Sequence, residues 1–160
     1  MFFLKLIVIF CCTAITFQDF KERTVLWFLF PILGIVLAII HLQNNPIEQF
    51  LLFILTNILL VSGVLLILIL YTRYIMRKKF LNVSFGLGDV LFFYALALGF
   101  PTMTFVFIFV GAILFSLILF LIFKKTWALK TVPLAGLMGL YLSGVFIINF
   151  FPTTPSLYLL

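Results

Sequence analysis

Charged residues are scarce in this chain of 160 residues. They make up 9% of it, whereas 66% of the residues are hydrophobic, and a soluble domain would carry roughly a quarter charged residues. So little charge excludes a polar coat over a water-facing surface. Several apolar runs are long enough to cross ~30 Å of hydrocarbon. We therefore expect an all-α integral membrane protein that forms one bundle over residues 1–160, with no separate soluble domain.

Residues that bind metals or form disulfides are also few. The two cysteines, Cys11 and Cys12, are adjacent and lie inside an apolar run. Neighbours in a helix point about 100° apart, which disfavours a disulfide, and their spacing is not that of a CxxC site. We interpret both as small apolar packing residues. The single histidine, His41, lies at the external end of an expected span and is interpreted as interfacial rather than catalytic.

Charges and prolines divide the apolar residues into six expected transmembrane spans. These are approximately 1–17, 25–42, 50–72, 89–100, 102–123 and 133–151. The first span lacks a basic region ahead of its apolar core, so we interpret it as a retained helix and not as a secretory signal. Pro31 lies within the second span and favours a bend there. Ala135, Gly139 and Ser143 follow one another at four-residue spacing, which predicts a smooth stripe where another helix packs closely.

The basic residues indicate how the spans are oriented. Nine of the ten fall in three links between spans. They are Lys21 and Arg23, then Arg73, Arg77, Lys78 and Lys79, and finally Lys124, Lys125 and Lys130. This pattern places the three links in the cytoplasm and both termini outside. The net charge of +6 therefore reflects orientation and not nucleic-acid binding, and the cluster from Arg73 to Lys79 is expected to contact anionic lipid headgroups.

Two of the four acidic residues stand at the cytoplasmic boundary of expected spans. Asp19 follows the first span and Asp89 begins the fourth. If the first and fourth helices are neighbours, the two carboxyls can meet, share one proton and titrate as a unit. That state is the one that acid–base hydrolysis needs. The alternative is structural: Asp89 caps its own helix, and Asp19 pairs with Lys21 or Arg23 at the interface.

The residues before Asp89 read GLGD over positions 86–89. Gly86 and Gly88 lack side chains and can take positive φ, which predicts a sharp turn into the fourth helix. They also predict open space beside Asp89, where an extended peptide could lie against the main chain. We therefore expect Gly86 and Gly88 to bind substrate.

At these residues the chain resembles the prepilin peptidase family, the GxGD-type membrane aspartic proteases. FGLGDV at 85–90 fits the GxGD signature, QDFKERTV at 18–25 looks like the segment that carries the first aspartate, and TVPLAG at 131–136 is similar to the start of the last helix. The resemblance covers nearly the whole chain. It implies an aspartic endopeptidase of the inner membrane that cuts the leader from prepilin-like precursors at the cytoplasmic face. Asp19, Asp89 and water would carry the reaction, without a metal or organic cofactor.

The chain also departs from the family pattern. VLFF follows GLGD where the family often has a lysine, Val25-Leu26 stands where Ile-Pro is usual, and Gly136 replaces a second proline. The paired CxxC zinc motifs of longer members, which are associated with methylating the trimmed pilin, do not occur in the sequence. We therefore expect neither zinc nor methyltransferase activity.

Two other functions stay open. A non-catalytic scaffold, such as an assembly subunit of a secretion or surface-filament system, would tolerate the loss of both aspartates. A small transporter is disfavoured because the few polar residues within the spans, Asn57, Ser62 and Ser116, form no obvious midplane site.

Overall fold

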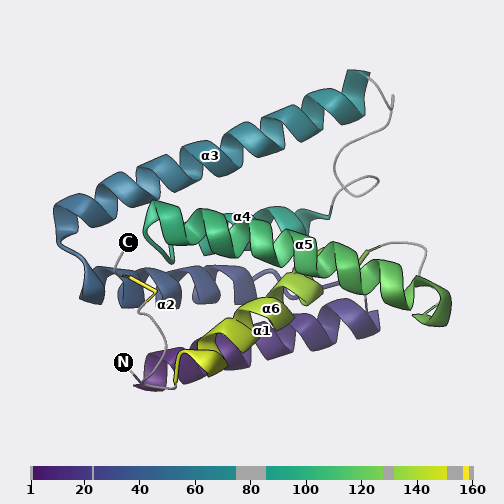
Figure 1. The fold of residues 1–160 in the computed structure, drawn as a ribbon, viewed down its shortest axis with the longest axis horizontal. Coiled ribbons are helices and arrows are strands. Elements are labelled where there is room, and N and C mark those ends of the chain that lie inside the picture. Colours follow the sequence, from purple (N-terminus) through teal and green to yellow (C-terminus); the bar gives the residue numbers. More distant parts are fainter. Residues whose placement is uncertain (1, 23, 75–85, 128–131, 151–156, 159–160) are drawn as a thin grey trace.

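A computed structural model describes residues 2–22, 24–74, 86–127, 132–150 and 157–158, with side chains to position 123 in the third range. Within these ranges the regular structure consists of six α-helices (Figure 1). They are α1 (Phe2–Glu22), α2 (Leu29–Asn44), α3 (Ile47–Tyr74), α4 (Leu87–Ala97), α5 (Thr102–Trp127) and α6 (Leu134–Ile148). The expectation of an all-α chain is confirmed. Of the predicted basic residues, Arg23, Arg77, Lys78, Lys79 and Lys130 lie outside the described residues, as do the side chains of Lys124 and Lys125.

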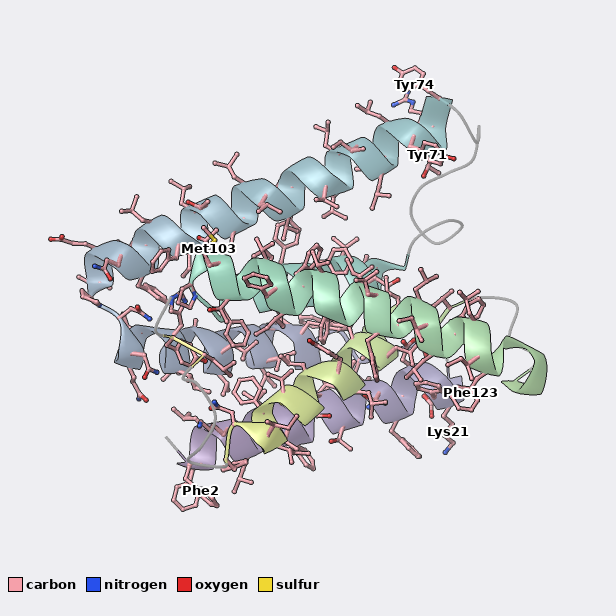
Figure 2. The ribbon with its side chains drawn as sticks, in the orientation of Figure 1. Phe2, Lys21, Tyr71, Tyr74, Met103 and Phe123 are labelled. Atoms are coloured by element: carbon pink, nitrogen blue, oxygen red, sulfur yellow. The ribbon has the colours of Figure 1, made fainter. Side chains whose placement is uncertain are left out.

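Three of these helices are long and apolar enough to cross a membrane: α1, α3 and residues 102–123 of α5. Their surfaces suit lipid, because large apolar side chains point outward along them (Figure 2), among them Phe2, Met103 and Tyr74. The helices α2, α4 and α6 are apolar but shorter, with 16, 11 and 15 residues. Three candidate spans are therefore evident from length and composition.

Two helix boundaries differ from those expected from the sequence. The helix α1 continues to Glu22, so Asp19 lies within its last turns and not in a link that follows it. Pro31 stands in the first turn of α2, which begins at Leu29. The expected bend at Pro31 is therefore wrong. A proline bends a helix by removing an interior hydrogen bond, whereas the N–H groups of the first turn have no partner within the helix.

The helix α6 packs along α1, and glycine at position 139 makes the close approach possible. A Cβ atom there would lie 3.1 Å from the carbonyl oxygen of Cys12 and 3.1 Å from Oγ1 of Thr16. This confirms the predicted close packing of the small-residue stripe in the last helix. Cys11 and Cys12 are buried free thiols in the same contact region, as expected for packing residues.

Polar side chains tie the helices together at the end of the bundle opposite the C-terminus of α1. Nζ of Lys5 in α1 donates to Oδ1 of Asn149, just after α6, at 2.7 Å. The ring of His41 is fully buried, and its Nδ1 lies 3.1 Å from the carbonyl oxygen of Leu98. His41 lies in the last turn of α2, and its ring packs against Phe50 inside the bundle.

Asn57 supports the turn between α4 and α5. Its buried side-chain amide donates to the carbonyl oxygens of Ala97, at 3.0 Å, and Phe100, at 2.9 Å. The first carbonyl belongs to the last residue of α4 and the second lies three residues beyond it, where the helix itself supplies no donors. We expect Asn57→Leu to lower the free energy of unfolding by about 2 kcal/mol, because both buried carbonyls lose their donor. Unfolding of the detergent-solubilised protein by denaturant measures this.

The exposed neighbour Thr56, on the same turn of α3, offers the matched control. Thr56→Val should change the unfolding free energy by less than about 0.5 kcal/mol. Equal stability of the Asn57 and Thr56 variants would contradict the role given to the Asn57 amide.

Candidate functional site

Asp19 and Asp89 converge on the first turn of α6. Oδ2 of Asp19 accepts a hydrogen bond from the N–H of Gly136 at 2.6 Å. Oδ1 of Asp89 accepts one from the N–H of Ala135 at 2.8 Å. The two donors are adjacent along the chain, where Cα atoms are ~3.8 Å apart. The two carboxyls therefore lie beside each other at the N-terminus of α6.

The start of α6 explains why both acids gather there. The first N–H groups of a helix have no partners within the helix, and Pro133, which precedes α6, makes no side-chain capping bond. Carboxylates from two other helices, α1 and α4, take this role instead. The positive end of the helix dipole also favours negative charge at this point.

The helices α1 and α4 do not pack directly on one another within the described part of the chain. We expected the aspartates to meet because α1 and α4 are neighbours. The two side chains do come together, but not through contact between these two helices. Instead, α6 contacts both α1 and α4, and its first turn collects one carboxyl from each. The first turn of α6 is the element that unites the pair.

Gly136 allows Asp19 to approach α6 closely. A Cβ atom at this position would lie 3.0 Å from both Cβ and Oδ2 of Asp19, and 3.3 Å from the ring of Phe20. One turn earlier in α1, the hydroxyl of Thr16 donates to the carbonyl oxygen of Gly136 at 2.9 Å. Two side chains of α1 thus hold the N–H and the C=O of the same glycine.

The glycines ahead of Asp89 act differently from the sequence-based expectation. Gly86 has φ −74° and ψ 143°, an extended conformation open to any residue, so the predicted positive-φ turn is wrong there. Its N–H donates to Oδ2 of Asp89 at 3.2 Å, and a Cβ atom would lie only 2.9 Å from that oxygen. At Gly88 a Cβ atom would lie 3.3 Å from the ring of Phe30. An aromatic ring, and not open space, therefore lies beside Gly88, whereas Gly86 is exposed.

Asp89 stands in the first turn of α4, outside the three helices that are long enough to cross a membrane. Burial raises its pKa to about 6, and the charge of Asp19 raises it as well. The hydrogen bonds from Ala135 and Gly86 lower the pKa, but they do not outweigh burial. Asp89 therefore holds a proton at a higher pH than an ordinary aspartate, beside a second carboxyl.

Sequence reasoning found the two acids but missed the groups that hold them. The amides of Ala135 and Gly136 and the hydroxyl of Thr16 were given no role. A usable signal was present in the sequence, because Pro133 favours a helix start and Gly136 follows in the first turn. No three side chains of His, Cys, Asp or Glu gather into a metal-binding group in the part of the chain that the structure covers.

Comparison with known proteins gives no match: no family model, no curated protein and no solved structure matches the chain.

Proposed function

We propose that the chain is a membrane aspartic endopeptidase that cleaves the leader peptide of prepilin-like precursors. The observation that carries the proposal is the pairing of Asp19 and Asp89 on the adjacent amides of Ala135 and Gly136. Two side-by-side carboxyls, one with a raised pKa, form the constellation that activates water for amide hydrolysis. The resemblance of the sequence around Asp19 and Asp89 to prepilin peptidases supplies the substrate class.

In this proposal the chain crosses the inner membrane six times, with both termini external and the aspartates at the cytoplasmic face. The ends of the helices support this orientation. The C-terminal ends of α1 and α3, which carry Lys21 and Arg73, lie at the same end of the bundle as the N-terminus of α4, which carries Asp89 (Figure 1). Bases are expected at the cytoplasmic end. The helix α4 has 11 residues and spans only ~16 Å. This is about half of the ~30 Å hydrocarbon core, so α4 is the shortest of the six proposed crossings.

In the proposed reaction the two carboxyls take different roles, and the raised pKa of Asp89 makes it the protonated partner. Asp19, as carboxylate, takes a proton from a water molecule while the water oxygen attacks the carbonyl carbon of the scissile peptide. Asp89, protonated, donates to the carbonyl oxygen as it gains charge. The C–N bond then breaks as the amide nitrogen takes the proton from Asp19. Asp89 recovers its own proton when the carbonyl re-forms, so the pair returns to its starting state.

A reconstitution experiment tests the function. The purified protein is placed in liposomes with a prepilin-like precursor that carries a basic leader and an apolar segment. We expect a shortened product whose new N-terminus lies at the leader boundary, as read by mass spectrometry. An intact precursor bound stably to the folded protein would instead identify a non-catalytic assembly subunit.

The pH dependence of cleavage follows from the raised pKa of Asp89. Because the pair must keep one proton, and burial raises the pKa of Asp89 to about 6, the rate should fall as the pH rises through that value. We expect roughly a tenfold loss for each pH unit above it. Initial rates between about pH 5 and pH 8 measure this, and a rate that rises across that range would contradict the assignment of the proton.

A further inference from the structure

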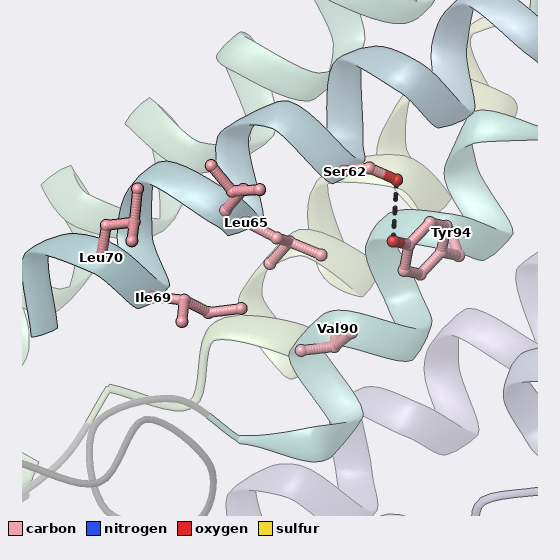
Figure 3. A pocket seen from close by; sticks show the side chains of 7 residues that line it. Ser62, Leu65, Ile69, Leu70, Val90 and Tyr94 are labelled. Atoms are coloured by element: carbon pink, nitrogen blue, oxygen red, sulfur yellow. Dashed lines mark hydrogen bonds between the residues drawn. The ribbon is translucent and has the colours of Figure 1, made fainter. Parts of the chain in front are cut away.

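A pocket of about 470 Å³ lies between α3 and α4 (Figure 3). It is lined by Ser62, Leu65, Leu66, Ile69 and Leu70 from α3 and by Val90 and Tyr94 from α4. The hydroxyl oxygens of Ser62 and Tyr94 lie 3.0 Å apart and form a hydrogen bond with each other. The rest of the lining is apolar, so the pocket suits a hydrocarbon occupant.

The pocket opens toward the surroundings of the bundle. The C-terminal half of α3 stands away from the other helices (Figure 1), and its side chains are largely exposed there, including Leu66 and Ile69. Because α3 is one of the candidate membrane spans, this open side would face lipid and not water.

Within the described part of α3, one cation, Arg73, continues the pocket-lining face. Arg73 is four residues after Ile69 and three after Leu70, so it lies on the same helical face, one turn beyond the pocket. Arg73 is exposed, and the exposed rings of Tyr71 and Tyr74 flank it at the end of α3 (Figure 2). Tyrosines of this kind mark the level of the lipid headgroups. Arg73 therefore stands at headgroup level above an apolar pocket.

The dimensions match one half of a bilayer. From Arg73 to Ser62 the helix rises ~16 Å, about half the thickness of the hydrocarbon core. We propose that this face binds an anionic phospholipid, with an acyl chain in the pocket and the phosphate on Arg73. The guanidinium fork fits a phosphate with two parallel hydrogen bonds. The inference rests on α3 lying in a membrane and not on peptidase activity.

The charge pattern favours a lipid over an apolar segment of a polypeptide. An anionic phospholipid always carries its negative group at headgroup level, directly where Arg73 stands. A polypeptide segment would need an acid at that one position to make the same pairing. The pocket is also continuous with the open, lipid-facing side of α3.

Native mass spectrometry of the detergent-solubilised protein tests the proposal, with phosphatidylglycerol and phosphatidylcholine as probes. We expect preferential retention of one phosphatidylglycerol molecule. Arg73→Gln should reduce that retention roughly fivefold, whereas Lys21→Gln, at an exposed base of α1, should not. Ile69→Trp should reduce retention by filling the pocket, while Ile67→Trp, at an exposed position on the opposite face of α3, should leave it unchanged.

Several results would overturn the proposal. Equal retention of the two lipids would remove the role of charge, and equal behaviour of the Arg73 and Lys21 variants would remove the role of Arg73. Equal behaviour of the Ile69 and Ile67 variants would remove the pocket. If no lipid is retained but an apolar peptide binds, and Ile69→Trp prevents that binding, the pocket belongs to a polypeptide partner.

Discussion

Replacing either aspartate by asparagine should abolish leader cleavage while the protein still accumulates in the membrane. We expect Asp19→Asn and Asp89→Asn each to lower the cleavage rate by roughly 10³-fold or more, because each removes one half of the acid–base pair. The fold should survive, since an asparagine oxygen can still accept the hydrogen bond from Gly136 or Ala135. Initial rates with the reconstituted precursor measure the effect. The double variant should be little worse than either single one, as groups that act as a unit are not additive.

The choice of asparagine separates catalysis from capping. Asparagine caps helices as well as aspartate does, so acids that serve only to cap α6 could be replaced without loss of function. Glu22→Gln is the matched control, because Glu22 is an exposed acid in the same last turns of α1, and it should cleave normally. Full cleavage by both asparagine variants would contradict the aspartic mechanism. The scaffold alternative would be the better account if the wild-type protein cleaves no precursor and both asparagine variants still complement fully in cells.

Adding one methyl group at Gly136 should also impair the site, because Asp19 lies directly against this position. The new Cβ atom would lie 3.0 Å from Cβ and Oδ2 of Asp19, so the side chain of Asp19 must move away from α6. A contact at 3.0 Å requires a shift of only a few tenths of an ångström. Because a misplacement of ~1 Å can cost about 10²-fold in rate, we expect a loss of roughly fivefold to tenfold for Gly136→Ala. The measurement compares the cleavage rate per folded molecule, with folding checked by size-exclusion chromatography.

Gly144 provides the control in the same helix. Apart from its chain neighbours and the backbone of its own helix, no atom lies within 4 Å of the position that a Cβ would take there, so Gly144→Ala adds the same methyl group without a clash. Alanine is also the better helix former, by about 1 kcal/mol. Gly144→Ala should therefore retain full activity. If the two alanine variants cleave equally well, Gly136 does not position Asp19.

Part of the arrangement was predictable because it depends on local chemistry. Apolar runs between charges predict helices, and the structure has a helix in each of the six expected regions. The acids Asp19 and Asp89 were found because charge is costly in lipid and so few acids occur. The distribution of bases then predicted that both acids lie at one end of the bundle, and their shared contact with α6 agrees with that prediction.

The rest depends on tertiary contacts that spacing does not encode. Whether α1 touches α4 is decided by how all the helices pack, and here α2 and α6 each contact both of them. The amides of Ala135 and Gly136 donate to the two aspartates because Pro133 provides no side-chain cap for them. A single sequence does not show that acids on other helices take this role. The burial of His41 was not predicted for a similar reason: its partner, the carbonyl of Leu98, lies on a different part of the chain.

The central claim is that the charges of the two carboxyls influence each other directly, and infrared titration of Asp89 tests it without any substrate. The band of its protonated carboxyl should disappear with an apparent pKa of about 6 in the wild-type protein and be missing in Asp89→Asn. In Asp19→Asn the pKa of Asp89 should fall, because a neighbouring negative charge has been removed. An unchanged pKa of Asp89 in Asp19→Asn would contradict the account.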